Sequence, residues 1–175
     1  LSYDVFPEEE KSRAYALMQK ETQRLIRLVE ENLDYEKLRA NKIVLRKQKI
    51  DAYKMISDLS NQLSNKAAQE ETTIDVLGDQ QAMVFGDQDR LTQVLFNLIN
   101  NAIQFTQKGQ IKVSVGRQGN ATIFTVSDTG IGMTAEQVDN VFERYYKADP
   151  SRMSTKGESG IGMAIVKQIV TLHDG

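Results

Sequence analysis

Hydrophobic residues near the start of the chain recur at steps of three and four residues. They are Leu17, Met18, Leu25, Leu28, Val29 and Leu33. This spacing places them along one face of an α-helix. Pro7 suits the first turn of such a helix, and the three acids that follow it suit the positive helix end. We predict one long helix from about Glu8 to Arg39, which is either a surface helix packed on a core or half of a dimerising helical hairpin.

The later part of the chain contains stretches in which hydrophobic and polar residues alternate, as in β-strands. The predicted strands are 43–50, where the alternation is imperfect, 72–77, 82–85, 110–115 and 121–127. The second and third should form a hairpin around Gly78 and Asp79. The fourth and fifth should form another around Gly119 and Asn120.

Helices are predicted between and after these strands. They span about 52–65, 88–105, 135–142 and 160–172. Asp51 and Asp87 can cap the first two, and Thr134 with Gln137 forms a capping box for the third. Strands mixed with helices that could all lie on one face of a sheet indicate an α+β fold. We therefore expect a two-layer α/β sandwich rather than a doubly wound sheet.

Composition narrows the class of protein. The 175 residues allow one domain, or one domain with an appendage. The formal net charge of −2 gives no electrostatic case for nucleic-acid binding, and the lack of cysteine excludes disulfides and thiolate metal sites. No apolar run approaches the ~20 residues that cross a bilayer. Because the first residue is not Met, we expect the chain to be a fragment of a longer protein.

Three groups of residues suit a nucleotide and its metal ion. Asp128 begins an Asp-Thr-Gly-Ile-Gly-Met run and can accept a hydrogen bond from an adenine amine. A second glycine-rich run, 157–164, precedes the last helix, and such turns let backbone N–H groups approach phosphates. Asn97 and Asn101 share one helix face and carry amide oxygens that suit Mg²⁺. Each residue alone could be a turn former or a solvent-facing amide, but together the three groups favour a nucleotide site.

The order of these motifs resembles the ATP-binding boxes of sensor histidine kinases, within the superfamily of gyrase, heat-shock chaperone and mismatch-repair ATPases. The similar segments are 97–106 (asparagine box), 128–133 (first glycine box), 141–147 (phenylalanine box) and 157–164 (second glycine box). The resemblance implies a Bergerat-type ATP-binding fold with ATP and Mg²⁺ as cofactors. It also implies that residues 1–40 are part of a dimerisation and phosphotransfer hairpin and residues 41–175 the catalytic domain. Two further strands usual in the family are expected to be missing from the chain.

The resemblance also implies roles for individual residues. Asn97 and Asn101 would be the catalytic metal ligands, Phe105 would stack on adenine, and Ser159 would donate to the terminal phosphate. The other expected nucleotide contacts are Gln104, Asp128, Gly130, Gly132, Met133, Val141, Arg144, Tyr146, Lys147, Gly160, Ile161, Gly162 and Met163. Gln104 replaces a usual lysine. Glu158 replaces a usual glycine and is expected to point outward, in a loop that resembles a lid.

Asn97 also helps to choose between reaction types. By resemblance, the ATP-hydrolysing relatives carry a glutamate there as a base, whereas an amide cannot take a proton. A neutral imidazole needs no such base, so Asn97 favours phosphoryl transfer to histidine. His173, the only histidine of the chain, is expected to be structural, with the acceptor histidine lying before Leu1.

The resemblance therefore predicts the ATP-binding core of a two-component sensor histidine kinase. The γ-phosphoryl group would pass to a histidine outside the chain and then to an aspartate of a response regulator. Homodimerisation would use the helical hairpin, and segments outside the chain would attach this cytoplasmic portion to a bacterial cell membrane. The alternatives are an ATP-hydrolysing relative of the same superfamily and a non-catalytic nucleotide-binding or dimerisation module.

Overall fold

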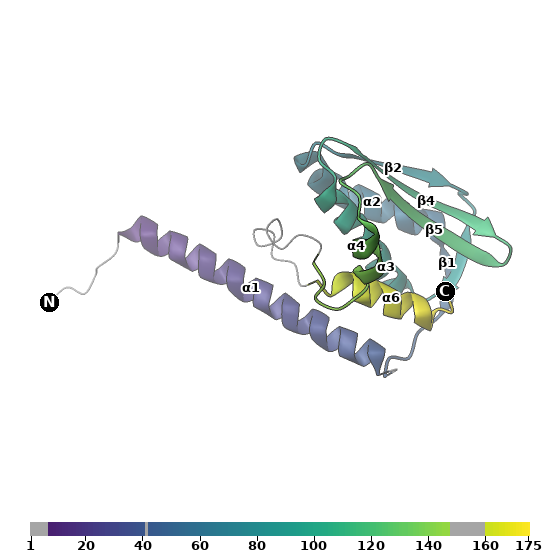
Figure 1. The fold of residues 1–175 in the computed structure, drawn as a ribbon, viewed down its shortest axis with the longest axis horizontal. Helices are drawn as coiled ribbons and strands as arrows, with labels where there is room; N and C mark the ends of the chain where they lie inside the picture. The colour runs from purple at the N-terminus through teal and green to yellow at the C-terminus, as the bar shows by residue number, and fades with distance from the viewer. Residues whose placement is uncertain (1–6, 41, 148–159) are drawn as a thin grey trace.

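The computed structural model describes residues 7–40, 42–147 and 160–175 (Figure 1). A long helix projects from a body in which helices lie against sheets (Figure 1). In chain order the elements are α1 (Glu8–Arg39), β1 (Gln48–Asp51), α2 (Ala52–Gln69), β2 (Thr73–Gly78), β3 (Met83–Gly86), α3 (Gln88–Phe105), β4 (Gln110–Gln118), β5 (Ala121–Asp128), α4 (Ala135–Asn140) and α6 (Gly162–Leu172).

Helix α1 has the predicted bounds, and most of it stands clear of the body (Figure 1). Pro7 precedes it and three glutamates occupy its first turn, as the helix dipole favours. Only Leu38, near its end, is fully buried, and it packs beside α3 and α6. Among the described helices, none combines the length and hydrophobicity needed to span a bilayer.

The strands form two sheets. In the larger, β4 pairs in parallel with β2 and antiparallel with β5. In the smaller, β1 pairs antiparallel with β3. Val113 on β4 lies opposite Val76 and Val126, so the three side chains share one face of the larger sheet. Helices α2 and α3 contact this sheet and form the second layer, which confirms the α+β class.

The predicted hairpin between residues 72–77 and 82–85 is wrong, although both strands exist. At Gly78 (φ +116°) the chain passes so close to β4 that a Cβ would lie 2.0 Å from the carbonyl oxygen of Val115. The Asp79 N–H donates to the same oxygen at 3.1 Å. The end of β2 is thereby held against β4, and β3 pairs with β1 instead.

The other element predictions hold with small changes. Strand β1 begins only at Gln48, because residues 42–47 run as a connection in which the Arg46 N–H bonds the Asp87 carboxylate at 2.8 Å. Helix α2 is longer than predicted and α4 slightly shorter. The bounds of α3, the capping box of α4 and the β4–β5 hairpin, with Gly119 at φ +60°, are confirmed.

Buried hydrophobic residues gather in two groups. The sheet cluster lies between the strands, α2 and α3; its members are Ile50, Ala52, Met55, Ile56, Leu59, Leu63, Ala67, Ala82, Leu91, Leu95, Ile99, Ala102, Ile103, Ile111, Val113 and Val115. The helix cluster joins α1, α3 and α6; its members are Leu38, Val94, Ile161, Ile165, Val166 and Ile169. Helix α3 contributes to both groups and connects them.

Candidate nucleotide site

Asn97 and Asn101 share one face of α3, and Asn97 on this face meets the start of α6. The side-chain N–H of Asn97 donates to the carbonyl oxygen of Gly162 at 3.2 Å. This bond orients the amide, since its nitrogen is the donor and its oxygen stays available. Asn100 points elsewhere, as expected, and its oxygen accepts from the Lys66 ammonium of α2. The asparagine box and the second glycine box are therefore adjacent.

Asp128 ends β5 and folds the first glycine box onto the end of α3. Its Oδ1 accepts from the Gly130 N–H at 2.8 Å and from the Thr106 hydroxyl at 3.5 Å. The Ile131 N–H donates to the carbonyl oxygen of Phe105 at 3.2 Å. A Cβ on Gly130 would lie 2.4 Å from that same oxygen, so only glycine fits there. Both bonds of the carboxylate use Oδ1, which leaves Oδ2 to accept from an exocyclic amine.

The second glycine box begins beside the phenylalanine box. The Tyr145 N–H donates to the Gly160 carbonyl oxygen at 2.9 Å. Gly160 has φ +70°, and a Cβ there would lie 3.1 Å from the Tyr145 Cα. Ile161 is buried in the helix cluster, and Gly162 opens α6. The N-terminal end of α6, which carries the positive end of the helix dipole, therefore lies next to Asn97.

The structure turns Arg144 toward α1. Its guanidinium donates to the Glu36 carboxylate at 2.7 Å and to the Asn32 side-chain oxygen. It also bonds the Tyr145 hydroxyl at 2.7 Å, and it lies 5.1 Å from the centre of the Tyr35 ring. All these partners lie on α1 or on the neighbouring tyrosine. A contact with a triphosphate, as expected from the sequence, would draw Arg144 away from them.

The other predicted nucleotide residues are spread over the four boxes of the sequence. Gly132 has φ +67°, and Met133 is exposed. Gln104, on the stripe of Asn97 and Asn101, has a buried side-chain oxygen that finds no hydrogen-bond partner among the described residues. The remaining residues are the partly buried Phe105, Val141, Tyr146, Lys147 and Met163. Ser159, Glu158 and the predicted lid lie outside the described residues.

Residues 86–175 match the family described as "Histidine kinase-, DNA gyrase B-, and HSP90-like ATPase". The chain belongs to this family. The prediction of an ATP-binding domain of the histidine kinase type is thereby confirmed. The family match covers α3 and everything after it, so it includes all four boxes.

The similarity to known proteins extends beyond residues 86–175. Sensor histidine kinase YclK of Bacillus subtilis (strain 168) is 38% identical over 177 residues, which cover 100% of this chain and 37% of YclK. Full-length ShkA in complex with AMPPNP has a TM-score of 0.79 at 24% identity, over 92% of this chain and 34% of ShkA. ThkA in complex with the response regulator TrrA has a TM-score of 0.67 at 22% identity, over 83% and 43%. The chain thus spans well under half of the length of these proteins.

ATP and Mg²⁺, the cofactors that the family implies, fit the residues present. The described residues contain no group of three or more His, Cys, Asp or Glu side chains placed to hold a metal ion. Asn97 and Asn101 offer amide oxygens, which suit Mg²⁺ when nucleotide phosphates complete its shell. The exposed Asp128 carboxylate, beside the close approach at Gly130, is an acceptor of the kind that an adenine amine requires.

His173 has a structural position in this member of the ATPase family. Its Nε2 accepts from the Asp87 N–H at 3.0 Å, and its Nδ1 lies 2.8 Å from the Ile169 carbonyl oxygen, to which it donates. Both ring nitrogens are thus engaged, and the lone pair of Nε2 faces a donor. This geometry supports the expectation that His173 is not a phosphoacceptor.

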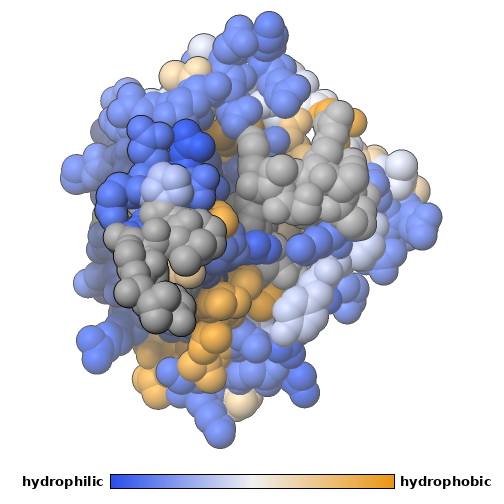
Figure 2. Space-filling model, turned by 90° about the vertical axis from the view of Figure 1, so that its left-hand side faces the viewer, coloured by the Kyte–Doolittle hydropathy of each residue, from blue (hydrophilic) through white to orange (hydrophobic). Residues whose placement is uncertain are grey.

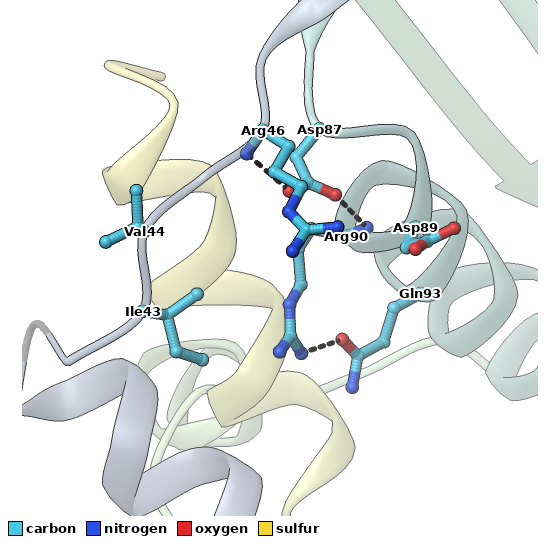
Figure 3. Close-up of a pocket in the computed structure, with 7 residues that line it drawn as sticks. All are labelled: Ile43, Val44, Arg46, Asp87, Asp89, Arg90 and Gln93. Atoms are coloured by element: carbon cyan, nitrogen blue, oxygen red, sulfur yellow. Dashed lines mark hydrogen bonds between the residues drawn. The ribbon is translucent and has the colours of Figure 1, made fainter.

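A hollow of about 230 Å³ lies at the start of α3, apart from the boxes (Figure 3). It is lined by Ile43, Val44, Arg46, Asp87, Asp89, Arg90 and Gln93. Burial alone would raise the pKa of Asp87, but hydrogen bonds from the backbone N–H groups of Arg46 and Arg90, and the charge of Arg90, bring it below its ordinary value. The hollow lies between the connection 42–47 and the start of α3, a contact that no local sequence signal predicted.

Proposed function

We propose that this chain binds Mg²⁺-ATP as the catalytic part of a protein-histidine kinase. The observation that carries the proposal is the bond between Asn97 and Gly162, because it joins the candidate metal ligands of α3 to the candidate phosphate site of α6. The ATPase family, the similarity to YclK and the Asp128 turn support the same activity. The γ-phosphoryl group would pass to a histidine outside this chain, and from there to an aspartate of a response regulator.

Each side of the site has a separate task in this proposal. Asp128 accepts from the adenine amine, and Phe105 stacks on the base. Asn97 and Asn101 hold Mg²⁺, which neutralises charge on the phosphates. Backbone N–H groups of Gly160 to Met163 and the positive end of α6 bind phosphate oxygens. Further contacts are assigned to Gln104, Gly130, Gly132, Met133, Val141, Arg144, Tyr146, Lys147, Ser159, Ile161 and Gly162.

Asn97 bears on the reaction as well as on binding. Its amide cannot remove a proton from water, whereas a neutral imidazole attacks phosphorus with its own lone pair. The chain's residues therefore position and neutralise, and the nucleophile comes from elsewhere. This favours phosphoryl transfer to histidine over ATP hydrolysis.

The partners of the proposed kinase follow from α1 and from the relatives. Exposed hydrophobic side chains of α1 are Tyr15, Leu17, Met18, Leu25, Ile26, Val29 and Leu33. Viewed from the side on which α1 begins, the molecule shows a hydrophobic patch among hydrophilic side chains (Figure 2). We assign α1 to a helical hairpin that dimerises in the whole protein. A response regulator, as in the complex of ThkA with TrrA, is the proposed partner, and segments outside the chain would link this cytoplasmic part to a membrane.

Calorimetric titration with ATP tests the base side of the site. Asp128→Asn should weaken binding by roughly 1.5–3 kcal/mol, the loss of a hydrogen bond to a charged group. Asp58→Asn, on the exposed surface of α2, is the matched control and should leave the affinity unchanged. An Asp128 variant with normal affinity would remove Asp128 from the site.

The same titration with and without Mg²⁺ tests the metal side. Asn101→Ala should weaken Mg²⁺-ATP binding more than binding of metal-free ATP, while Asn100→Ala, which faces Lys66, should not discriminate. In a whole protein that carries the proposed acceptor histidine, γ-labelled ATP should give an acid-labile phosphohistidine. Equal losses with and without metal, or release of phosphate without labelled protein, would contradict the kinase proposal.

A further inference from the structure

A closed set of polar contacts joins α1 to α3. The Arg90 guanidinium donates to both carboxylate oxygens of Asp34, at 2.9 and 2.7 Å. Gln93 donates from its amide to Asp34 at 2.9 Å and accepts from Arg90 at 2.8 Å. Each of the three side chains thus bonds the other two. Figure 3 shows Arg90 and Gln93 side by side on α3, bonded to one another.

This contact differs from the ion pairs within α1 and, like the pair of Glu36 with Arg144, joins α1 to the body. The side chains of Asp34 and Arg90 are each 23% exposed, and they come from different helices. The pairs Lys11–Glu8 and Arg24–Glu21 lie within α1 itself. A partly desolvated, multiply bonded pair holds a geometry more firmly than an exposed one. The Asp34 contact is therefore able to define how α1 lies on the body.

The same stripe of α3 carries the candidate metal ligands. Arg90, Gln93, Asn97 and Asn101 follow at steps of three, four and four residues, so they lie along one face of the helix. Arg90 and Gln93, the first two residues of this stripe, bond α1. Asn97 and Asn101, the last two, are the proposed Mg²⁺ ligands. About one turn of α3 separates Gln93 from Asn97, and about three turns separate Arg90 from Asn101.

Hydrophobic packing alone would leave this placement less defined. Leu38 lies one helical turn beyond Asp34 and packs in the helix cluster beside Val94. Contacts between apolar side chains are non-directional, so they resist separation of α1 from α3 more than rotation or sliding. The bonds of Asp34 have direction and select one arrangement among those that the packing allows.

We infer that Asp34, Arg90 and Gln93 are positioning residues, which set the angle and distance between α1 and the metal-binding end of α3. The inference rests on the proposed function, in which α1 belongs to the hairpin that presents the acceptor histidine. It assigns these residues no contact with ATP. Their loss should therefore slow phosphoryl transfer without weakening nucleotide binding.

The test uses a whole protein that carries the proposed acceptor histidine, and measures Mg²⁺-ATP affinity and single-turnover labelling separately. Asp34→Ala should keep the affinity within about twofold and slow transfer by roughly ten- to 100-fold, as expected for a misplaced reacting group. The reciprocal exchange of Asp34→Arg with Arg90→Asp should recover much of the rate. Glu30→Ala, on the exposed surface of α1, is the matched control and should transfer normally.

The outcomes separate this inference from the proposed function. A wild-type chain that fails to label itself would remove the kinase proposal. A labelling wild type with an equally fast Asp34→Ala variant, or a variant that loses affinity and rate in parallel, would overturn the positioning role alone. If Asp34→Ala does not fold, Gln93→Ala decides, because it keeps the Asp34–Arg90 pair and should still slow transfer at normal affinity.

Discussion

The two hydrophobic clusters serve different parts of the candidate site. The sheet cluster supports β5 and the end of α3, which carry Asp128 and Phe105, the residues proposed to contact the base. The helix cluster contains Ile161, next to the first glycine of α6, and so supports the expected phosphate side. It also contains Leu38 of α1. The contact between α1 and the body is therefore continuous with the proposed phosphate side, and α3, which contributes to both clusters, links it to the proposed base side.

Truncating one residue in each cluster gives the largest expected effects. Ile111→Ala on β4 and Leu38→Ala on α1 both remove fully buried side chains, and each should cost about 2–5 kcal/mol of unfolding free energy. Ile111→Ala should lower hydrogen-exchange protection through the whole sandwich. Leu38→Ala should lower it chiefly in α6 and the end of α1, and it should weaken ATP binding more than adenosine binding. Equal losses of protection in β4 and α6 for both variants would show that the clusters act as one.

The seam between the clusters gives an effect of intermediate size. His173, after α6, bonds the Asp87 N–H at the start of α3. His173→Ala would leave this donor without its partner, so urea unfolding should show a loss of about 1–3 kcal/mol. His173→Gln can restore one bond and should recover part of the stability. A normal midpoint for His173→Ala would mean that the packing alone holds α6 in place.

Acid should weaken the joint between the connection 42–47 and the start of α3, with the smallest effect. The pKa of Asp87 in the folded chain lies below its ordinary value of 3.8, so its carboxylate contributes stability above that value. This contribution is lost as the pH falls below 3.8 through the folded-state pKa. Asp87→Asn should therefore be less stable than the wild type near neutral pH and should lose less stability on acidification. Parallel stability curves for the two proteins between pH 5 and roughly pH 2 would contradict this role.

Local signals were sufficient for most elements of the fold. The α3 helix could be predicted because its hydrophobic spacing and its cap, Asp87, lie within the same segment. The partner of β2 could not, because β4 follows more than thirty residues later and its pairing competes with the nearer β3. The alternation of hydrophobic and polar residues in 72–77 fits pairing with β3 as well as pairing with β4. Only the approach of Gly78 to Val115 distinguishes them.

In the candidate site, too, some features could be predicted from the sequence and others could not. The order of the boxes pointed to Asn97, Asp128 and Gly162, and the structure brings Asn97 and Gly162 into contact. The orientation of Arg144 was not predictable, since Glu36 lies 108 residues earlier in the chain. Asp34 and its partners were missed for the same reason. Motifs report which chemistry is present, whereas contacts between α1 and the body depend on the assembled fold.

The length of α1 gives its short anchorage a mechanical consequence. Its 32 residues extend for about 48 Å, and its inter-helix contacts with the body are concentrated in the last two turns. A tilt of roughly 10° at Leu38 would move the opposite end by about 8 Å. The helix is thus a lever with its fulcrum beside the expected phosphates. A small displacement of the first turns of α1 would therefore exert a large torque on the few side chains that hold its last two turns. In the other direction, a shift of a few tenths of an ångström at the site would become a larger movement at the far end of α1.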